Sequence, residues 1–179
     1  VNIRFCGFGG QGIILSGKTL GTAVVTYHNL YAVQTQSYGS EARGGMCQAE
    51  LIISDAPIQS PHSDEKDILV ALSPTALEEY LPSLKPGGTL IIDPLLIDDV
   101  PDVDARVIEV PAAETADELG NRLVANMVLL GFLIESTGMV GKEDLVQAVA
   151  ELVPERYLDL NKQAVDRGIG LAEGTTVEV

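Results

Sequence analysis

The sequence predicts an α/β fold: a single domain over residues 1–179, with a mostly parallel, Rossmann-like sheet flanked by helices and a helical C-terminal third. Three observations support this prediction. Short apolar segments typical of strands alternate with helical patterns as far as Pro111, which favours a parallel α/β sheet. Beyond Pro111, helical patterns follow one another without a convincing strand. A glycine-rich turn separates the first strand from the first helix, and 179 residues can form one compact core.

Strand signals occur in six segments, several of them bounded by Gly, Pro, Ser or Asp. These segments are Ile3–Phe8, Leu30–Gln34, Met46–Ile53, Ile68–Leu72, Thr89–Asp93 and Arg106–Val110. Helical spacing of three and four runs from Ile13 to Tyr27, and a second helix begins with Pro74 at a position that suits proline. The last three helices are expected over Arg122–Ser136, Lys142–Val153 and Pro154–Leu171, before a small polar tail from Glu173 that we expect to fray.

The charge of the chain excludes two classes of partner. The net charge is −15, and residues 61–179 hold 8 basic and 23 acidic side chains, whereas residues 1–60 hold three of each. An acidic surface repels nucleic acid and anionic membranes, so we expect neither to be a partner. The longest apolar stretch, Leu123–Ile134, is too short to span a bilayer. No cationic and apolar leader precedes Gly7, and we expect a cytoplasmic location.

The sequence offers no catalytic or metal-binding residue. Cys6 and Cys47 are the only cysteines, and His28 and His62 stand alone, so no spacing suits zinc or an iron–sulfur cluster. Cysteines within strand-like segments are usually small core residues. A nucleophile elbow of the form G-x-S-x-G is also absent.

The glycine turn is the first candidate site. Its candidate binding residues are Gly7, Gly9, Gly10, Gln11 and Gly12. A turn of this kind lets a ligand approach the backbone and directs N–H groups of the first helical turn at it, which suits phosphate or another anion. The other interpretation is that these glycines only allow the strand and helix to pack closely.

Two familiar phosphate-binding motifs fit this turn incompletely. The spacing of Gly7, Gly9 and Gly12 matches the dinucleotide fingerprint, but no carboxylate stands about 20 residues further on to hold a ribose. Nor does Gly12 precede the Lys and Ser or Thr of a P-loop, because Lys18 lies well inside the helix.

A second candidate site is the segment 36–45, which lies between two predicted strands. It contributes Tyr38, Glu41, Arg43, Gly44 and Gly45 as candidate binding residues. We expect this loop to lie beside the glycine turn at the carboxyl ends of the strands, where Arg43 could contact a phosphate or carboxylate. A solvated loop with no ligand is the simpler interpretation.

Together these two motifs resemble the gamma subunit of the 2-oxoacid:ferredoxin oxidoreductases. The segments 7–13 and 37–45 carry the resemblance, and the segments 126–131 and 161–168 extend it over nearly the whole chain. The resemblance implies an enzyme complex that converts a 2-oxoacid to acyl-CoA and CO2, with reduction of ferredoxin. It implies thiamine diphosphate, Mg, [4Fe–4S] clusters and coenzyme A in the complex, with no cofactor bound by this chain alone.

The same resemblance implies alpha, beta and delta subunits as partners, and ferredoxin through the complex. The isolated chain should be inactive and could form a homodimer. The motif from Ser37 to Gly45 looks most like the same motif in enzymes that act on 2-oxoglutarate. The motifs of the 2-ketoisovalerate and pyruvate types are nearly as similar. Two alternatives stay open: an indolepyruvate oxidoreductase beta-type subunit, against which Glu41-Ala42-Arg43 argues, and a stand-alone nucleotide-binding module without catalysis.

Overall fold

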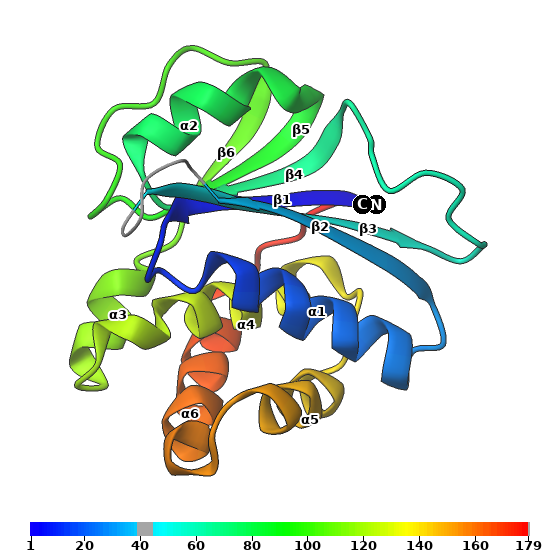
Figure 1. Ribbon diagram of the computed structural model, residues 1–179. Coiled ribbons are helices and arrows are strands. Elements are labelled where there is room, and N and C mark those ends of the chain that lie inside the picture. Colours follow the sequence, from blue (N-terminus) through cyan, green and yellow to red (C-terminus); the bar gives the residue numbers. More distant parts are fainter. Residues whose placement is uncertain (39–44, 179) are drawn as a thin grey trace.

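The protein is built around a twisted six-stranded sheet, as the computed structural model in Figure 1 shows. The structure describes residues 1–38 and 45–178. The sheet has the strand order β2-β3-β1-β4-β5-β6. Its strands are β1 (Asn2–Phe8), β2 (Tyr31–Tyr38), β3 (Met46–Ser54), β4 (Lys66–Ala71), β5 (Leu84–Ile92) and β6 (Ala105–Glu109).

Helices cover the two faces of this sheet unequally. One face carries α2 alone, and the other carries the remaining α-helices (Figure 1). The helices are α1 (Ile13–Tyr27), α2 (Pro74–Tyr80), α3 (Ala112–Glu118), α4 (Ala125–Thr137), α5 (Lys142–Leu152) and α6 (Glu155–Leu171), with short 3₁₀ turns η1 (Leu81–Ser83) and η2 (Arg122–Val124). Among the described residues, no helix combines the length and apolar character that crossing a membrane requires.

The sheet is mostly parallel, as predicted. β1, β4, β5 and β6 pair in parallel, while β3 runs antiparallel to both of its neighbours, β1 and β2. Five strands therefore point in one direction and only β3 in the other. A parallel connection needs a crossover of a dozen or more residues, and the segment between Tyr38 and Met46 is too short for one. The carboxyl ends of β1 and β2 and the beginning of β3 consequently lie at one edge.

Two local predictions were wrong because tertiary contacts decide them. Helix α3 was not expected, since seven residues carry little periodicity. It forms where the buried Asp93 carboxylate accepts a hydrogen bond from Ala113 N at 2.6 Å. The tail does not fray over its described part: Val177 is buried, and its N–H donates to Ser136 O at 2.7 Å.

Helices α4 and α6 cross at a point where neither backbone leaves room for a side chain. A Cβ on Gly131 would collide with Val165 O, and a Cβ on Gly168 would collide with Val128 O and lie 2.9 Å from Phe132 N. Because these obstacles are backbone atoms, the helices would have to separate. The glycine pair thus sets the distance between α6 and the core of the domain.

We expect Gly168→Ala to lower the free energy of unfolding by about 2–3 kcal/mol, because overpacking at a backbone contact forces the helices apart. The matched control is Gly170→Ala in the same helix, where a Cβ meets no atom within 4 Å. That variant should gain about 0.5 kcal/mol from helix propensity. Urea unfolding of both variants measures the difference, and equal stabilities would contradict the close crossing.

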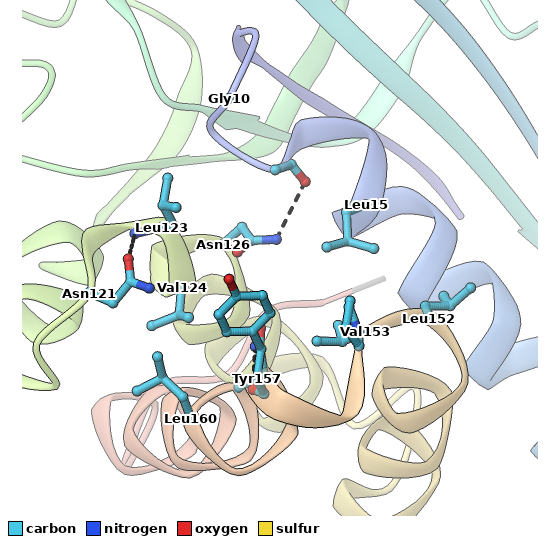
Figure 2. A pocket seen from close by; sticks show the side chains of 13 residues that line it. Gly10, Leu15, Asn121, Leu123, Val124, Asn126, Leu152, Val153, Tyr157 and Leu160 are labelled. Atoms are coloured by element: carbon cyan, nitrogen blue, oxygen red, sulfur yellow. Dashed lines mark hydrogen bonds between the residues drawn. The ribbon is translucent and has the colours of Figure 1, made fainter.

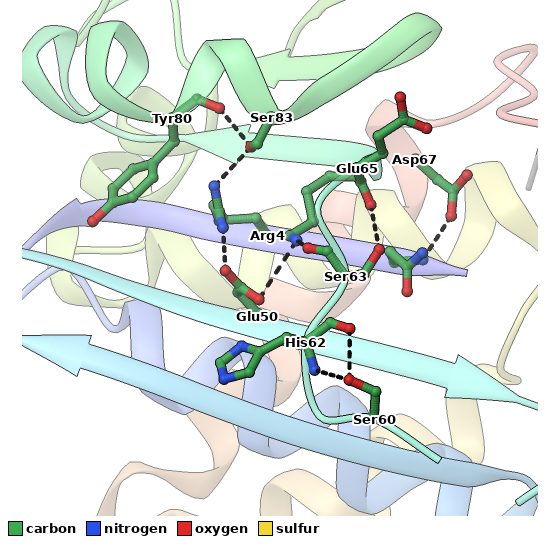
Figure 3. A network of polar contacts seen from close by, with 11 residues as sticks. Arg4, Glu50, Ser60, His62, Ser63, Glu65, Asp67, Tyr80 and Ser83 are labelled. Atoms are coloured by element: carbon green, nitrogen blue, oxygen red, sulfur yellow. Dashed lines mark hydrogen bonds and ion pairs between the residues drawn. The ribbon is translucent and has the colours of Figure 1, made fainter. Parts of the chain in front are cut away.

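A buried cluster of charges stabilises the opposite face of the sheet (Figure 3). Arg4 on β1 forms an ion pair with Glu50 on β3, and Lys66 Nζ lies 3.5 Å from the second Glu50 oxygen. Arg4 also donates to Ser83 Oγ at 2.7 Å. Burial alone would raise the pKa of Glu50, but the two cations outweigh it and hold that pKa below its usual 4.5.

This shift predicts acid sensitivity. A carboxylate with a lowered pKa in the folded state stabilises the fold above its unfolded pKa, and that contribution is lost as pH falls through the folded pKa. We therefore expect the free energy of unfolding to fall more steeply below pH 4.5 in the natural chain than in Glu50→Gln. Urea unfolding along a pH series measures the slopes, with the exposed Glu173→Gln as the control. If the free energy of unfolding falls with pH at the same slope in the natural chain and in Glu50→Gln, this explanation is wrong.

Candidate functional site

The glycine turn lies at the carboxyl edge of the sheet, directly after β1. Its Gly9 N–H donates to Gly45 O, just before β3, at 2.9 Å. The second predicted motif therefore begins and ends beside the first, because Tyr38 pairs with Cys47 and Phe8 pairs with Met46. Glu41, Arg43 and Gly44 of that motif lie outside the described residues.

Gln11 holds the turn in place. Its side-chain Oε1 accepts a hydrogen bond from Phe8 N at 2.6 Å, and its Nε2 donates to Leu72 O at 2.8 Å. One amide group thus ties the end of β1 to the end of β4. Both hydrogen bonds are within the protein, so Gln11 positions the turn rather than presenting this amide to a ligand.

The other glycines of the turn divide into two kinds. A Cβ on Gly7 would collide with Gln11 Oε1, and one on Gly12 would lie 2.5 Å from Asn126 Nδ2, so a side chain at either position would displace the Gln11 or Asn126 side chain. Gly10 differs: its φ is +100°, it is exposed, and a Cβ there would meet no protein atom within 4 Å. The space above Gly10 is therefore open to a ligand.

Helix α1 begins at this open side. Its N-cap is Gly12, at φ +75°, and no side chain caps the first turn. The first N–H groups of an α-helix have no partners within the helix and carry a partial positive charge. The turn and the start of α1 thus form a local environment that favours an anion.

A pocket of about 320 Å³ opens on one side of the turn (Figure 2). Gly10 and Gly12 line it, and Tyr157 of α6 points its hydroxyl toward Asn126. The buried Asn126 side chain donates to Gly12 O at 3.4 Å, which joins α4 to the turn. Leucine and valine side chains line much of the remainder, and an apolar pocket with a few polar groups is typical of ligand sites.

A second hollow of about 180 Å³ also borders the turn. Gly10 and Leu123 line both hollows. Arg122, whose side chain is 52% exposed, lines the second one and lies 3.7 Å from Asp117. The sequence analysis missed this cation, because nothing along the chain indicates that η2 returns to the glycine turn.

Tyr38 reaches the same edge from β2 but lines neither hollow. It is 64% exposed, and its hydroxyl oxygen accepts a hydrogen bond from Gln36 Nε2 at 3.2 Å. Phe8, Leu123 and Tyr157 are further exposed apolar side chains around the turn. These side chains surround the turn with apolar surface, which is typical of an interaction site.

The two cysteines are built into the core. Cys6 on β1 and Cys47 on β3 are both buried, and burial raises the pKa of the Cys6 thiol to about 12. Thiolates are the form that binds metals, so these residues do not fit a cluster. Across residues 1–38 and 45–178, no three His, Cys, Asp or Glu side chains lie together as metal ligands would.

This geometry defines an α/β domain with an open glycine turn at the carboxyl edge of its sheet. The chain belongs to the pyruvate ferredoxin/flavodoxin oxidoreductase family, whose model matches residues 2–171. A 2-oxoglutarate synthase subunit KorC from Methanothermobacter marburgensis is 46% identical over 173 residues, which cover 93% of each chain. The predicted family resemblance is therefore confirmed.

Two solved structures share this fold. A keto/oxoacid ferredoxin oxidoreductase gamma subunit from Geobacter sulfurreducens is 39% identical, with a TM-score of 0.85 over 97% of this chain and 99% of its own. A 2-oxoglutarate:ferredoxin oxidoreductase from Magnetococcus marinus, with 2-oxoglutarate, coenzyme A and succinyl-CoA bound, is 27% identical. Its TM-score is 0.88 over 99% of this chain and 32% of its own.

Proposed function

We propose that this chain is the gamma-type subunit of a 2-oxoacid:ferredoxin oxidoreductase that favours 2-oxoglutarate. The complex would convert the 2-oxoacid and coenzyme A to acyl-CoA and CO2, with reduction of ferredoxin. The observation that carries the proposal is the open glycine turn, whose Gly10 lines two hollows, in a chain similar along its length to a 2-oxoglutarate synthase subunit. Alpha, beta and delta subunits are the proposed partners, and a cytoplasmic location stays a prediction.

The proposed division of labour follows from the residues present. Thiamine diphosphate with Mg and the [4Fe–4S] clusters would be held by partner subunits, because the buried Cys6 and Cys47 do not fit a cluster. Coenzyme A would be the ligand of this chain, bound through its phosphates at the glycine turn. The open backbone at Gly10 and the start of α1 would accept an anionic part of it, with Arg122 as the nearby cation. Arg43 stays a second candidate from the sequence.

The role of this chain would be to position the ligand, and its own residues would not take part in the chemical reaction. Gln11 fixes the turn, and Asn126 and Gly12 set the wall of the larger pocket. No described residue of the site forms a nucleophile–base pair, so substrate binding and closure against the partner subunits are the contributions that its geometry supports. The stand-alone nucleotide-binding module is the second candidate, and the same open turn favours it.

We expect the purified chain alone to be colourless and inactive, because electron transfer requires groups that its own residues do not hold. Addition of the partner subunits should produce viologen reduction that depends on coenzyme A, with 2-oxoglutarate preferred over pyruvate, 2-ketoisovalerate and indolepyruvate. Iron content and viologen reduction by the chain and the complex are the measurements. Turnover or stoichiometric iron in the chain alone would refute the subunit assignment, and a preference for indolepyruvate would favour that alternative.

We expect Gly10→Val to raise the apparent coenzyme A constant of the assembled complex by roughly 10-fold or more, since a side chain would fill the approach to the backbone. Gly87→Val is the matched control: its φ is +71°, its Cβ would meet no atom within 4 Å, and it lies near the amino end of β5. Both glycines have a positive φ, so each variant carries a backbone strain of about 1–3 kcal/mol.

The comparison of these two variants separates binding from folding. A change in the coenzyme A constant confined to Gly10→Val supports the proposed site. An unchanged constant and unchanged turnover in both assembled complexes would mean that the turn serves packing alone.

A further inference from the structure

The two hollows that Gly10 lines differ in charge. Arg122 lines the second hollow. In the described part of the chain, no charged side chain lines the larger pocket, which is bordered mainly by leucine, valine and asparagine. Removing an anion from water without a cation beside it is costly, so a phosphate or carboxylate fits the second hollow better. The larger pocket fits an uncharged part of a ligand.

Two nearly buried asparagines line the larger pocket. Asn126 and Asn161 are only 2% and 7% exposed. Their Nδ2 atoms donate to backbone oxygens, of Gly12 at 3.4 Å and of Tyr157 at 2.7 Å, which fixes the orientation of each amide. Among the hydrogen bonds of the described residues, none is donated to the Oδ1 atom of either side chain. Two acceptor oxygens therefore remain for an occupant of the pocket.

Asn121 supplies the opposite hydrogen-bonding group to the same pocket. Its Oδ1 accepts a hydrogen bond from Leu123 N at 3.0 Å as the cap of η2, so its Nδ2 is the group left to donate. Tyr157 adds an aromatic ring that is 42% exposed, with its hydroxyl toward Asn126 (Figure 2). The pocket thus combines two acceptors, one donor and an aromatic ring with apolar walls.

These groups select the chemistry of the occupant. An apolar side chain from another protein does not suit them, because it would bury both oxygens without a donor. Adenine has apolar ring faces, and its 6-amino group donates hydrogen bonds beside a ring nitrogen that accepts one. That pattern complements two acceptors and one donor. Guanine has an oxygen in place of this amino group and would direct an acceptor at acceptors.

We propose that the larger pocket holds the adenine ring of coenzyme A. This inference rests on the proposed function, in which the reaction takes place on the partner subunits and the thiol of coenzyme A extends toward them. The nucleotide end is then the part that this chain retains. A free adenine nucleotide presents the same base, and the measurements below separate these two ligands.

The proposed contacts use each polar group of the pocket once. The 6-amino group donates to Asn126 and Asn161, and the neighbouring ring nitrogen accepts from Asn121. The Tyr157 ring lies against the base, a contact that stabilises bound bases in many nucleic-acid-binding proteins. Because Gly10 lines both hollows, the phosphates next to the base would meet the open turn.

Titration calorimetry of the purified full chain with coenzyme A, AMP, IMP and ribose 5-phosphate is the first test. IMP has an oxygen where AMP has the 6-amino group, and ribose 5-phosphate lacks the base. We expect AMP to bind with a dissociation constant on the order of 100 µM. IMP and ribose 5-phosphate should each bind at least ~10-fold more weakly, because they lose the contacts to the asparagines. Coenzyme A should bind at least as tightly as AMP.

Two variants test the pocket itself. Asn121→Ser removes the donor but keeps an oxygen that caps a helix well, and AMP should bind it about 5-fold more weakly or worse. Tyr157→Leu should weaken AMP binding by roughly 5-fold or more, because it removes the stacking ring. Tyr31→Leu is the matched control, at a tyrosine that is 47% exposed on β2, and should bind AMP as the natural chain does. Circular dichroism checks that each variant is folded.

The outcomes separate this proposal from the proposed function. Equal affinities for AMP and IMP, or no detectable binding of AMP, overturn the adenine site even if the assembled complex consumes coenzyme A. Binding of AMP without binding of coenzyme A overturns the assignment to coenzyme A and identifies a free nucleotide as the ligand. A preference for AMP that is lost in Asn121→Ser and kept in Tyr31→Leu, together with binding of coenzyme A, supports the proposal.

Discussion

The candidate site depends on one side-chain amide, that of Gln11. By bonding Phe8 N and Leu72 O, it joins the ends of two neighbouring parallel strands and closes the turn between them. Gly10 has a positive φ and open space where a Cβ would lie, and α1 begins two residues later at Gly12 without a side-chain cap. Gly10 lines both hollows beside the turn.

Glycine residues have two separate structural roles in this protein. Gly7, Gly12, Gly131 and Gly168 permit backbones and buried side chains to approach more closely than any Cβ would allow. Gly10 instead leaves space where no protein atom lies. The crossing of α4 and α6 belongs to the first role, yet it also shapes the site, because Asn126 comes from α4 and Tyr157 from α6. Packing at the helix crossing therefore fixes the width of the larger pocket.

Charge is distributed unevenly along the chain. The first sixty residues, which form β1, α1, β2 and β3, are neutral and contain the glycine turn. The acidic residues lie mainly in the remainder of the chain, where their negative charge repels other acidic molecules. An anionic ligand at the glycine turn would meet a segment of the chain that carries no net charge.

The sequence by itself determined the α/β class, the mostly parallel sheet, the glycine turn and the family, because these depend on local patterns of apolar residues and glycine. It placed Gly9 and Gly45 at one edge, and the structure joins them by a hydrogen bond. Only the tertiary structure decided that β3 runs antiparallel, that the buried Asp93 carboxylate supports α3, and that Arg122 lies beside Gly10. The physical reason is that these features depend on contacts between residues far apart in the chain, which no local pattern encodes.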